Sequence, residues 1–186
     1  MAKILICVDC QYDFIEGGNL PVEGGTKALD YLANYVADHS DEYDAIVMTL
    51  DWHPSDHCSF TENGGVWPKH CVRYSHGASI YNPLVILLPV EKTVYFEKGC
   101  KVGKDEYSFL DNRKNVNRFK GIIESLRPDA IDVCGIAGDV CVMNTIKDLL
   151  SLKSPSSINV IMPAVASLND ATFAQFITEQ HLNIMK

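Results

Sequence analysis

Short, mostly apolar runs recur along the whole chain, and segments of helical periodicity separate them. Five runs of strand length occupy residues 4–8, 45–48, 93–96, 130–134 and 158–162. Apolar residues at successive rather than alternate positions are typical of strands that are covered on both faces, which occur mainly in parallel sheets. The pattern therefore predicts five buried parallel strands.

Between these runs, apolar residues recur at the spacing of a helix. The first stripe, with Thr26 as its expected N-cap, consists of Leu29, Leu32, Ala33 and Val36. Similar stripes occupy residues 116–126 and 142–150. Strands that alternate with helices predict right-handed crossovers and an α/β fold, a three-layer αβα sandwich around a doubly wound, mostly parallel sheet.

Composition and charge narrow the class of protein. The chain of 186 residues suits one domain, and its net charge of -8 without clustered Lys or Arg disfavours a nucleic-acid partner. The apolar run before Asp9 is too short for a signal-peptide core or a membrane span, so we expect a cytoplasmic protein without a membrane partner. Seven irregularly spaced cysteines do not indicate a disulfide framework. The sequence is compatible with a homo-oligomer but does not specify one.

Reactive residues stand where the predicted strands end. Asp9 follows the first run, Asp51 the second and Lys98 the third, and Cys141 follows the Gly-rich turn after the fourth. The carboxyl ends of parallel strands in an open sheet face one crevice. We therefore expect a carboxylate, an amine, a thiol and metal ligands to share one pocket.

Cys141 is a candidate nucleophile. At the start of a helix its thiolate would be stabilised by the helix dipole and by free backbone N–H groups, which could also bind an oxyanion. Asp9 is the available base, and the Lys98 ammonium would favour both the carboxylate and the thiolate. The plainer alternatives are a buried first-turn cysteine, a turn-capping aspartate and a surface lysine.

A metal site is predicted around Asp51 and His53, whose side chains point to the same side of an extended segment. His57 and His70 follow within residues 52–89, a long segment rich in Gly, Pro, His and aromatic residues that we expect to cover the crevice. One aspartate with two histidines suits zinc, iron or manganese and leaves coordination positions open. Alternatively, the histidines only cap a loop and keep it in contact with solvent.

Three aromatic residues are expected to line an apolar slot near these groups, unless they fill the core instead: Phe14, Trp67 and Tyr107.

Six fragments in chain order carry a family resemblance. They are DCQYDF at 9–14, GGNLPV at 17–22, DWHP at 51–54, WPKHCV at 67–72, KG at 98–99 and GIAGDVCV at 135–142. Together they resemble the nicotinamidase/pyrazinamidase branch of the isochorismatase-like cysteine hydrolases. The resemblance implies one such domain over residues 1–186, with about six strands.

The resemblance also implies roles for individual residues. The implied catalytic triad is Asp9, Lys98 and Cys141. The implied metal ligands are Asp51, His53 and His70. The implied oxyanion hole consists of the N–H groups of Ala137 and Cys141, with a cis peptide bond between Ile136 and Ala137.

The chain departs from the family pattern at Gly138 and Val140, where Thr and Tyr are common, so we expect a roomier wall there. His57 is left open as a fourth ligand or a more distant neighbour, and the final strand is expected to be short or missing.

The implied reaction is hydrolysis of nicotinamide to nicotinic acid and ammonia through a Cys141 thioester. The implied metal, zinc first with iron and manganese as alternatives, would orient the pyridine ring while Phe14, Trp67 and Tyr107 contact the substrate. Two other functions stay open: hydrolysis of another small amide such as a carbamoyl or ureido compound, and a metal-binding redox sensor in which Cys141 is oxidised.

Overall fold

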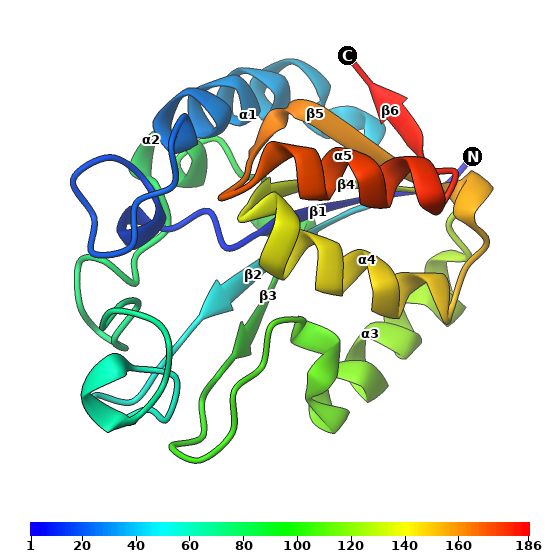
Figure 1. Cartoon of the computed structure of the whole chain (residues 1–186). Helices are drawn as coiled ribbons and strands as arrows, with labels where there is room; N and C mark the ends of the chain where they lie inside the picture. Colours follow the sequence, from blue (N-terminus) through cyan, green and yellow to red (C-terminus); the bar gives the residue numbers. More distant parts are fainter.

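The computed structural model describes residues 1–186, and its centre is a sheet of six parallel strands (Figure 1). The strands are β1 Lys3–Val8, β2 Ala45–Asp51, β3 Thr93–Lys98, β4 Ala130–Ile136, β5 Ile158–Ala166 and β6 Asn183–Met185. They lie in the order β3-β2-β1-β4-β5-β6. The order reverses between β1 and β4, and ligands of doubly wound sheets bind beside the carboxyl ends of the strands at such a point.

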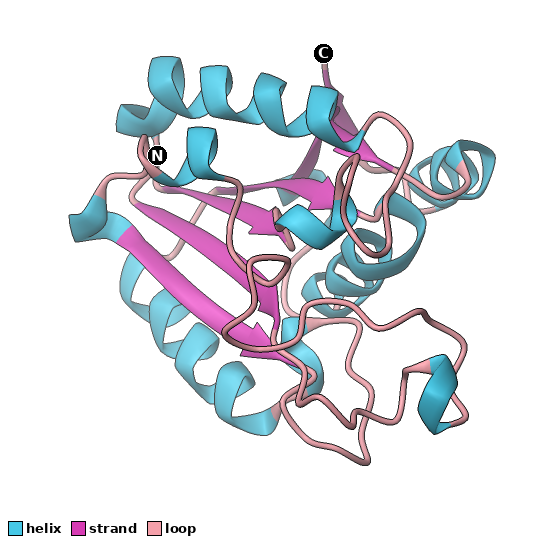
Figure 2. Ribbon diagram, turned by 90° about the vertical axis from the view of Figure 1, so that its left-hand side faces the viewer, coloured by secondary structure: helices cyan, strands magenta, loops and turns pink.

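Helices cover both faces of this sheet (Figure 2). One face carries α1 Gly25–His39 and the short helix α2 Asn82–Val85. The other face carries α3 Arg113–Leu126, α4 Met143–Leu150 and α5 Asp170–Glu179. The three-layer αβα sandwich predicted from the alternation of runs and stripes is therefore confirmed.

Strand β1 separates two hydrophobic cores because its successive side chains point to opposite faces. Leu5 and Cys7 pack into the core beneath α1. The alternate residues pack into the core beneath α3, α4 and α5: Ile4, Ile6 and Val8. All five apolar runs form strands, as predicted. The continuous apolar character of β1, β2 and β4 reflects burial on both sides, whereas β3, at the edge of the sheet, is partly exposed. The final strand β6 is present but short, and it pairs with β5.

The start of α1 differs from its prediction. Its N-cap is Gly24, which has φ 74°, rather than Thr26. The Glu16 carboxylate accepts the backbone N–H groups of Gly24 and Thr26 at 3.2 and 2.8 Å and also the Thr26 hydroxyl. A carboxylate at a helix N-terminus satisfies free N–H groups and interacts favourably with the dipole. The cap is thus supplied from the preceding loop, and Thr26 is wrong as the N-cap.

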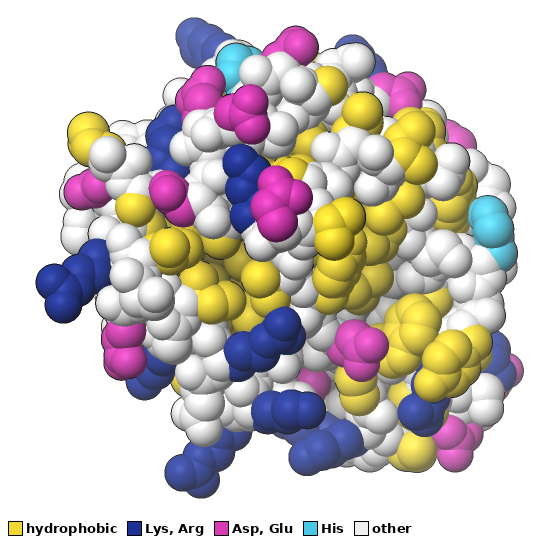
Figure 3. All heavy atoms as spheres, turned by 180° about the vertical axis from the view of Figure 1, so that it is seen from behind, with side chains coloured by type: hydrophobic (Ala, Val, Ile, Leu, Met, Phe, Trp, Pro, Cys, Tyr) yellow, Lys and Arg dark blue, Asp and Glu magenta, His cyan; other side chains and the backbone are white.

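All seven cysteines are free, and Cys7 and Cys134 lie buried on paired positions of β1 and β4. None of the helices combines the length and apolar character that a membrane span requires. Figure 3 shows the molecule from behind, where hydrophobic areas are interspersed with charged side chains of both signs.

Candidate active site and metal centre

A pocket of about 410 Å³ opens at the carboxyl ends of the strands. Cys141 and Ala137 form one part of its wall, and Asp51, His53 and His70 form another. The segment of residues 52–89 contributes to the cover, as expected, because His53, Trp67 and His70 belong to it.

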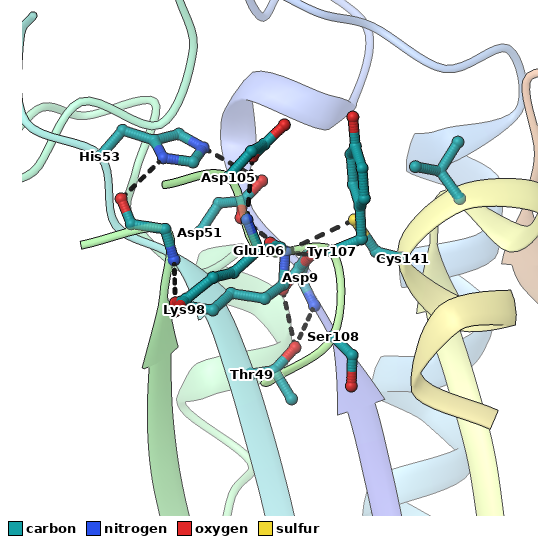
Figure 4. Close-up of polar contacts among 12 residues, drawn as sticks. Asp9, Thr49, Asp51, His53, Lys98, Asp105, Glu106, Tyr107, Ser108 and Cys141 are labelled. Atoms are coloured by element: carbon teal, nitrogen blue, oxygen red, sulfur yellow. Dashed lines mark hydrogen bonds and ion pairs between the residues drawn. The ribbon is translucent and has the colours of Figure 1, made fainter. Parts of the chain in front are cut away.

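The Lys98 ammonium joins the reactive groups within this end of the sheet (Figure 4). Its Nζ lies 2.7 Å from Asp9 Oδ2 and 2.5 Å from Asp51 Oδ1. The same Nζ lies 3.4 Å from Cys141 Sγ. One carboxylate oxygen of Asp9, one of Asp51 and the Cys141 sulfur all lie within 4.8 Å of one another. The acid, the amine and the thiol predicted from separate strand ends are thus brought together.

Asp9 is held in an unusual backbone conformation where β1 ends. Its φ is 49°, in the left-handed region that residues other than glycine rarely occupy. Thr49 of β2 fixes both parts of the residue: it accepts the Asp9 N–H on Oγ1 at 3.2 Å, and its hydroxyl donates to Asp9 Oδ1 at 2.7 Å. Such conformations persist where surrounding contacts determine them, and they are frequent at functional sites.

Burial dominates the electrostatics of the two groups that would exchange a proton. It raises the pKa of Asp9, although the Lys98 ammonium acts in the opposite direction. It also raises the pKa of Cys141 well above its usual value, and Lys98 offsets this effect only in part. The Lys98 ammonium favours the thiolate, as expected from the sequence, but desolvation outweighs this effect on the pKa of Cys141. A carboxylate of raised pKa thus lies beside a thiol of raised pKa.

Lys98 itself remains charged. Burial alone would lower the pKa of this fully buried amine, but Asp51 and Asp9 outweigh burial and raise the pKa well above its usual value. The alternative of a solvated surface lysine is wrong, since no part of Lys98 reaches solvent. One ammonium therefore stands between two carboxylates and the thiol.

Cys141 lies in the turn between β4 and α4. The Ile136–Ala137 peptide bond is cis, as the resemblance implied. Residues Gly138–Val142 then form a π-helical turn that leads directly into α4. Cys141 is 7% exposed and lines the pocket, so its sulfur faces the cavity from the start of this helical segment.

Asp51, His53 and His70 converge on a second point beside Asp9, Lys98 and Cys141. Asp51 Oδ2 lies 3.5 Å from His53 Nε2 and 3.6 Å from His70 Nε2. His53 Nδ1 contacts the Gly99 carbonyl at 3.0 Å, and His70 Nδ1 contacts the Pro68 carbonyl at 2.7 Å. Because a carbonyl only accepts, each Nδ1 carries a proton, and this selects the tautomer in which Nε2 is the atom free to bind a metal. Two imidazole nitrogens and one carboxylate oxygen suit a divalent metal.

Comparison with known proteins agrees with this geometry. A family model of the isochorismatase domain matches residues 3–179. The chain belongs to the isochorismatase family.

Three relatives place it more closely within the isochorismatase family. The nicotinamidase/pyrazinamidase of Mycobacterium tuberculosis is 33% identical over 177 residues, which cover 92% of this chain and 91% of that protein. The crystal structure of the pyrazinamidase of Pyrococcus horikoshii in complex with zinc superposes with a TM-score of 0.85 at 28% identity, covering 100% and 99% of the two chains. The structure of PnC1 from L. infantum in complex with nicotinate superposes with a TM-score of 0.83 at 30% identity, covering 100% and 92%.

His57, which the isochorismatase-family resemblance left open, has both ring nitrogens engaged away from the three ligands. Its Nδ1 contacts Ser59 Oγ at 2.7 Å, and its Nε2 contacts the Lys104 carbonyl at 3.0 Å. The ring packs against His53 with the centroids 4.2 Å apart. The ring therefore supports His53 from the side and does not offer a fourth ligand atom to the metal site.

The aromatic residues expected near the site all line the pocket: Phe14, Trp67 and Tyr107. Trp67 Nε1 donates to the Tyr107 hydroxyl at 3.2 Å, so the two side chains form one wall. The roomier wall expected at Gly138 and Val140 stays a prediction. Val140 lines the pocket and Gly138 does not. A Cβ at Gly138 would clash with Ser167 Oγ and lie 2.8 Å from Val165 Cγ1, so neighbouring side chains fill the space beside this glycine.

Several residues of the site were not found from the sequence. Gln11 holds the Asp51 backbone, accepting its N–H on Oε1 at 2.8 Å and donating from Nε2 to its carbonyl at 2.8 Å. Thr49 and Gln11 are polar residues next to apolar runs, a weak signal that was available. Asp105 and Glu106 also line the pocket, but they stand in a loop without any distinguishing pattern.

Proposed function

We propose that this protein is a nicotinamidase that hydrolyses nicotinamide to nicotinic acid and ammonia, with residues 1–186 forming one isochorismatase-like domain. The observation that carries the proposal is the position of Lys98 Nζ, within 2.7 Å of Asp9 and 3.4 Å of Cys141 Sγ, beside a pocket that also contains two histidines. The similarity to proteins named nicotinamidase and to a nicotinate complex supports the choice of substrate.

In the first half of the reaction, Asp9 accepts the proton of the Cys141 thiol, and the sulfur attacks the carboxamide carbon. The C–S bond forms as the carbonyl π electrons move to oxygen. The backbone N–H groups of Ala137 and Cys141 bind the oxyanion, a role supported by the position of both residues in the pocket wall. Lys98 stabilises the negative charge as it passes from the thiolate to the substrate.

The C–N bond then breaks as the oxyanion collapses. Asp9 returns its proton to the leaving nitrogen, and ammonia departs from the thioester. Asp9 next takes a proton from water, whose oxygen attacks the thioester carbon and releases nicotinic acid. The proton restores the Cys141 thiol, so Asp9 ends the cycle as a carboxylate.

The second cluster would position the ring. Asp51, His53 and His70 would hold a divalent metal, for which we propose zinc, with iron and manganese as alternatives. When bound, the metal would supply a Lewis-acid position for the pyridine nitrogen. Phe14 and Trp67 would hold the ring and Tyr107 would contact the substrate above Cys141, so that the amide lies over the sulfur.

The charge of the pocket favours a neutral amide. Its wall includes the acidic residues Asp51, Asp105 and Glu106 but no arginine and no lysine. Apart from the proposed metal and the buried Lys98, which Asp9 and Asp51 already pair with, a carboxylate-bearing carbamoyl or ureido substrate would find no cation in the pocket wall and would face Asp105 and Glu106. This observation supports nicotinamide and similar uncharged rings over an anionic amide.

Ammonia release from a panel of amides tests the proposal. We expect turnover of nicotinamide and no turnover of a carboxylate-bearing N-carbamoyl compound. Cys141→Ala should abolish ammonia release while leaving metal content and thermal unfolding unchanged. Cys58→Ala is the matched control, because it removes another thiol that does not line the pocket. Retained turnover in Cys141→Ala would remove the covalent route, and turnover of the N-carbamoyl compound alone would replace the substrate class.

A further inference from the structure

A buried carboxylate that the proposed reaction does not use lies directly behind the metal ligands. Glu106 is 3% exposed, and both of its carboxylate oxygens have partners. Oε2 accepts the backbone N–H of Gly99 at 3.0 Å, and Oε1 accepts the Lys104 ammonium at 2.9 Å. Burying an ionised carboxylate is unfavourable unless such bonds compensate it. Its position therefore calls for a physical reason.

Gly99 connects this carboxylate to His53. The Gly99 carbonyl contacts His53 Nδ1 at 3.0 Å, while the N–H of the same residue donates to Glu106. Gly99 has φ 63°, and a Cβ there would lie only 2.5 Å from His53 Nδ1. The peptide thus lies against the imidazole ring, and the orientation of its carbonyl decides which ring nitrogen carries the proton.

We propose that Glu106 is a positioning residue that fixes the backbone of Gly99 and, through its carbonyl, the orientation and tautomer of His53 at the metal site. The inference rests on the metal ligands assigned above. Hydrogen bonds to the far nitrogen of a ligating histidine orient the ring and commonly change metal affinity by about 10- to 100-fold. Glu106 acts one peptide unit farther away: it binds the N–H of Gly99, and the Gly99 backbone, at φ 63°, connects that N–H to the carbonyl that contacts His53.

The loop that carries Glu106 is itself anchored near the site. His57 Nε2 contacts the Lys104 carbonyl at 3.0 Å, and the Lys104 ammonium also donates to the Asp111 carbonyl at 2.7 Å. The Glu106 carbonyl lies 3.5 Å from Lys98 Nζ. Figure 4 shows Glu106 among Lys98, Asp51 and His53. A carboxylate on this loop is therefore held at a defined distance from the Gly99 peptide.

Pairing with Lys104 is not a sufficient reason for burying Glu106. The Lys104 side chain is 48% exposed, and ion pairs that involve an exposed partner contribute little because solvent screens them. The bond from the buried Gly99 N–H is the contact that water cannot replace. If the bond to the Gly99 N–H matters, removing the Glu106 acceptor should weaken metal binding. If the ion pair matters, removing the Lys104 ammonium should weaken it.

Zinc affinity of the metal-free full-length protein, measured by competition with a chelating dye, tests the inference without substrate. Glu106→Met keeps the side-chain length but removes the acceptor, and we expect the dissociation constant for zinc to rise by about 10- to 100-fold. Glu106→Gln keeps an oxygen acceptor for the Gly99 N–H and should stay within about threefold of wild type. Lys104→Met removes the ion pair, together with the donor to the Asp111 carbonyl, but leaves the bond between Gly99 and Glu106 and should also stay within that range.

Three results would overturn the role of Glu106: wild-type affinity in Glu106→Met, equal losses in the Met and Gln variants, or a loss of about tenfold or more in Lys104→Met. The last result does not depend on whether Glu106→Met folds. Because no turnover is measured, failure of the wild-type protein to hydrolyse nicotinamide would reject the proposed function and leave this comparison standing.

Discussion

Two fully buried aspartates lie in neighbouring strands of the sheet but are stabilised in different ways. Asp132, in the first half of β4, accepts the Tyr43 hydroxyl at 2.6 Å and the Asn159 amide at 2.5 Å. Asp9, at the carboxyl end of β1, has a threonine hydroxyl and an ammonium that it shares with Asp51. Neutral hydrogen-bond donors thus compensate the burial of Asp132, whereas Asp9 depends on the Lys98 ammonium, which also pairs with Asp51.

The difference shows how a buried carboxylate is kept inert or made reactive. Burial raises the pKa of Tyr43, and the hydrogen bond to Asp132 raises it further. The Tyr43 hydroxyl therefore keeps its proton and remains a donor. This cluster lines no part of the candidate pocket. Burial raises the pKa of Asp9 because one shared ammonium compensates it incompletely. The first arrangement stabilises the fold, and the second leaves a carboxylate able to take a proton.

Exchanging each aspartate for asparagine is expected to give the largest contrast. Asp9→Asn removes the proton acceptor, so kcat for nicotinamide should fall by about 10²–10⁴-fold, the usual contribution of general acid–base catalysis. Asp132→Asn should leave kcat within about twofold, because Asp132 touches no part of the pocket. Ammonia release under saturating substrate measures both. Similar losses of kcat in the two variants would erase the functional distinction between the clusters.

Replacing the shared ammonium should affect the fold as well as the reaction. Lys98→Met leaves Asp9 and Asp51 buried without a counter-charge, and removing one partner of a buried pair typically lowers the free energy of unfolding by about 3–5 kcal/mol. Lys153→Met is a control at the other end of the sheet, since that ammonium donates to the Pro128 carbonyl and is partly exposed. Urea unfolding measures both variants. Unchanged stability of Lys98→Met would contradict the charge balance described here.

The metal cluster gives a third, smaller contrast with the Asp132 cluster. His53→Ala should lower zinc affinity and raise the KM for nicotinamide by about 10-fold or more, because one of three ligands is lost. Metal analysis and initial rates across substrate concentrations test this expectation. Lost metal with an unchanged KM would mean that the metal supports the structure and does not hold the ring.

The smallest expected effect is structural. Tyr43→Phe leaves Asp132 with one donor fewer and should lower the free energy of unfolding by about 1–3 kcal/mol, with kcat unchanged. Thermal and urea unfolding, combined with the ammonia assay, separate the two quantities. A fall in kcat without a loss of stability would show that the Asp132 cluster affects the reactive groups around Asp9.

The sequence predicted those parts of the molecule that depend on local pattern. Continuous apolar runs identified five strands because the central strands β1, β2 and β4 are buried on both faces, and the ends of the strands located Asp9, Lys98 and Cys141. Strand β6 has three residues, too few for a pattern to emerge. Helix α5 contains a short stripe, Phe173, Phe176 and Ile177, that was not assigned to a helix.

Other features are decided by contacts between distant residues. The cap of α1 comes from Glu16, which no local rule connects to Gly24. The resting charge of Cys141 depends on how deeply the sulfur is buried, and the sequence pattern carries no measure of that depth. Glu106 acquires its role through the Gly99 peptide, seven residues away and in a different turn. Tertiary packing, rather than residue type, determines each of these.

The most direct test of the account is rapid acid quenching of the wild-type protein during turnover of nicotinamide, followed by intact-protein and peptide mass spectrometry. We predict a mass increase equal to one nicotinoyl group, located on Cys141 and absent from Cys141→Ala and Asp9→Asn. Release of ammonia by the wild-type protein with the nicotinoyl group on another residue, or with no acylated protein at any quench time, would contradict the convergence of Asp9, Lys98 and Cys141 as one catalytic unit.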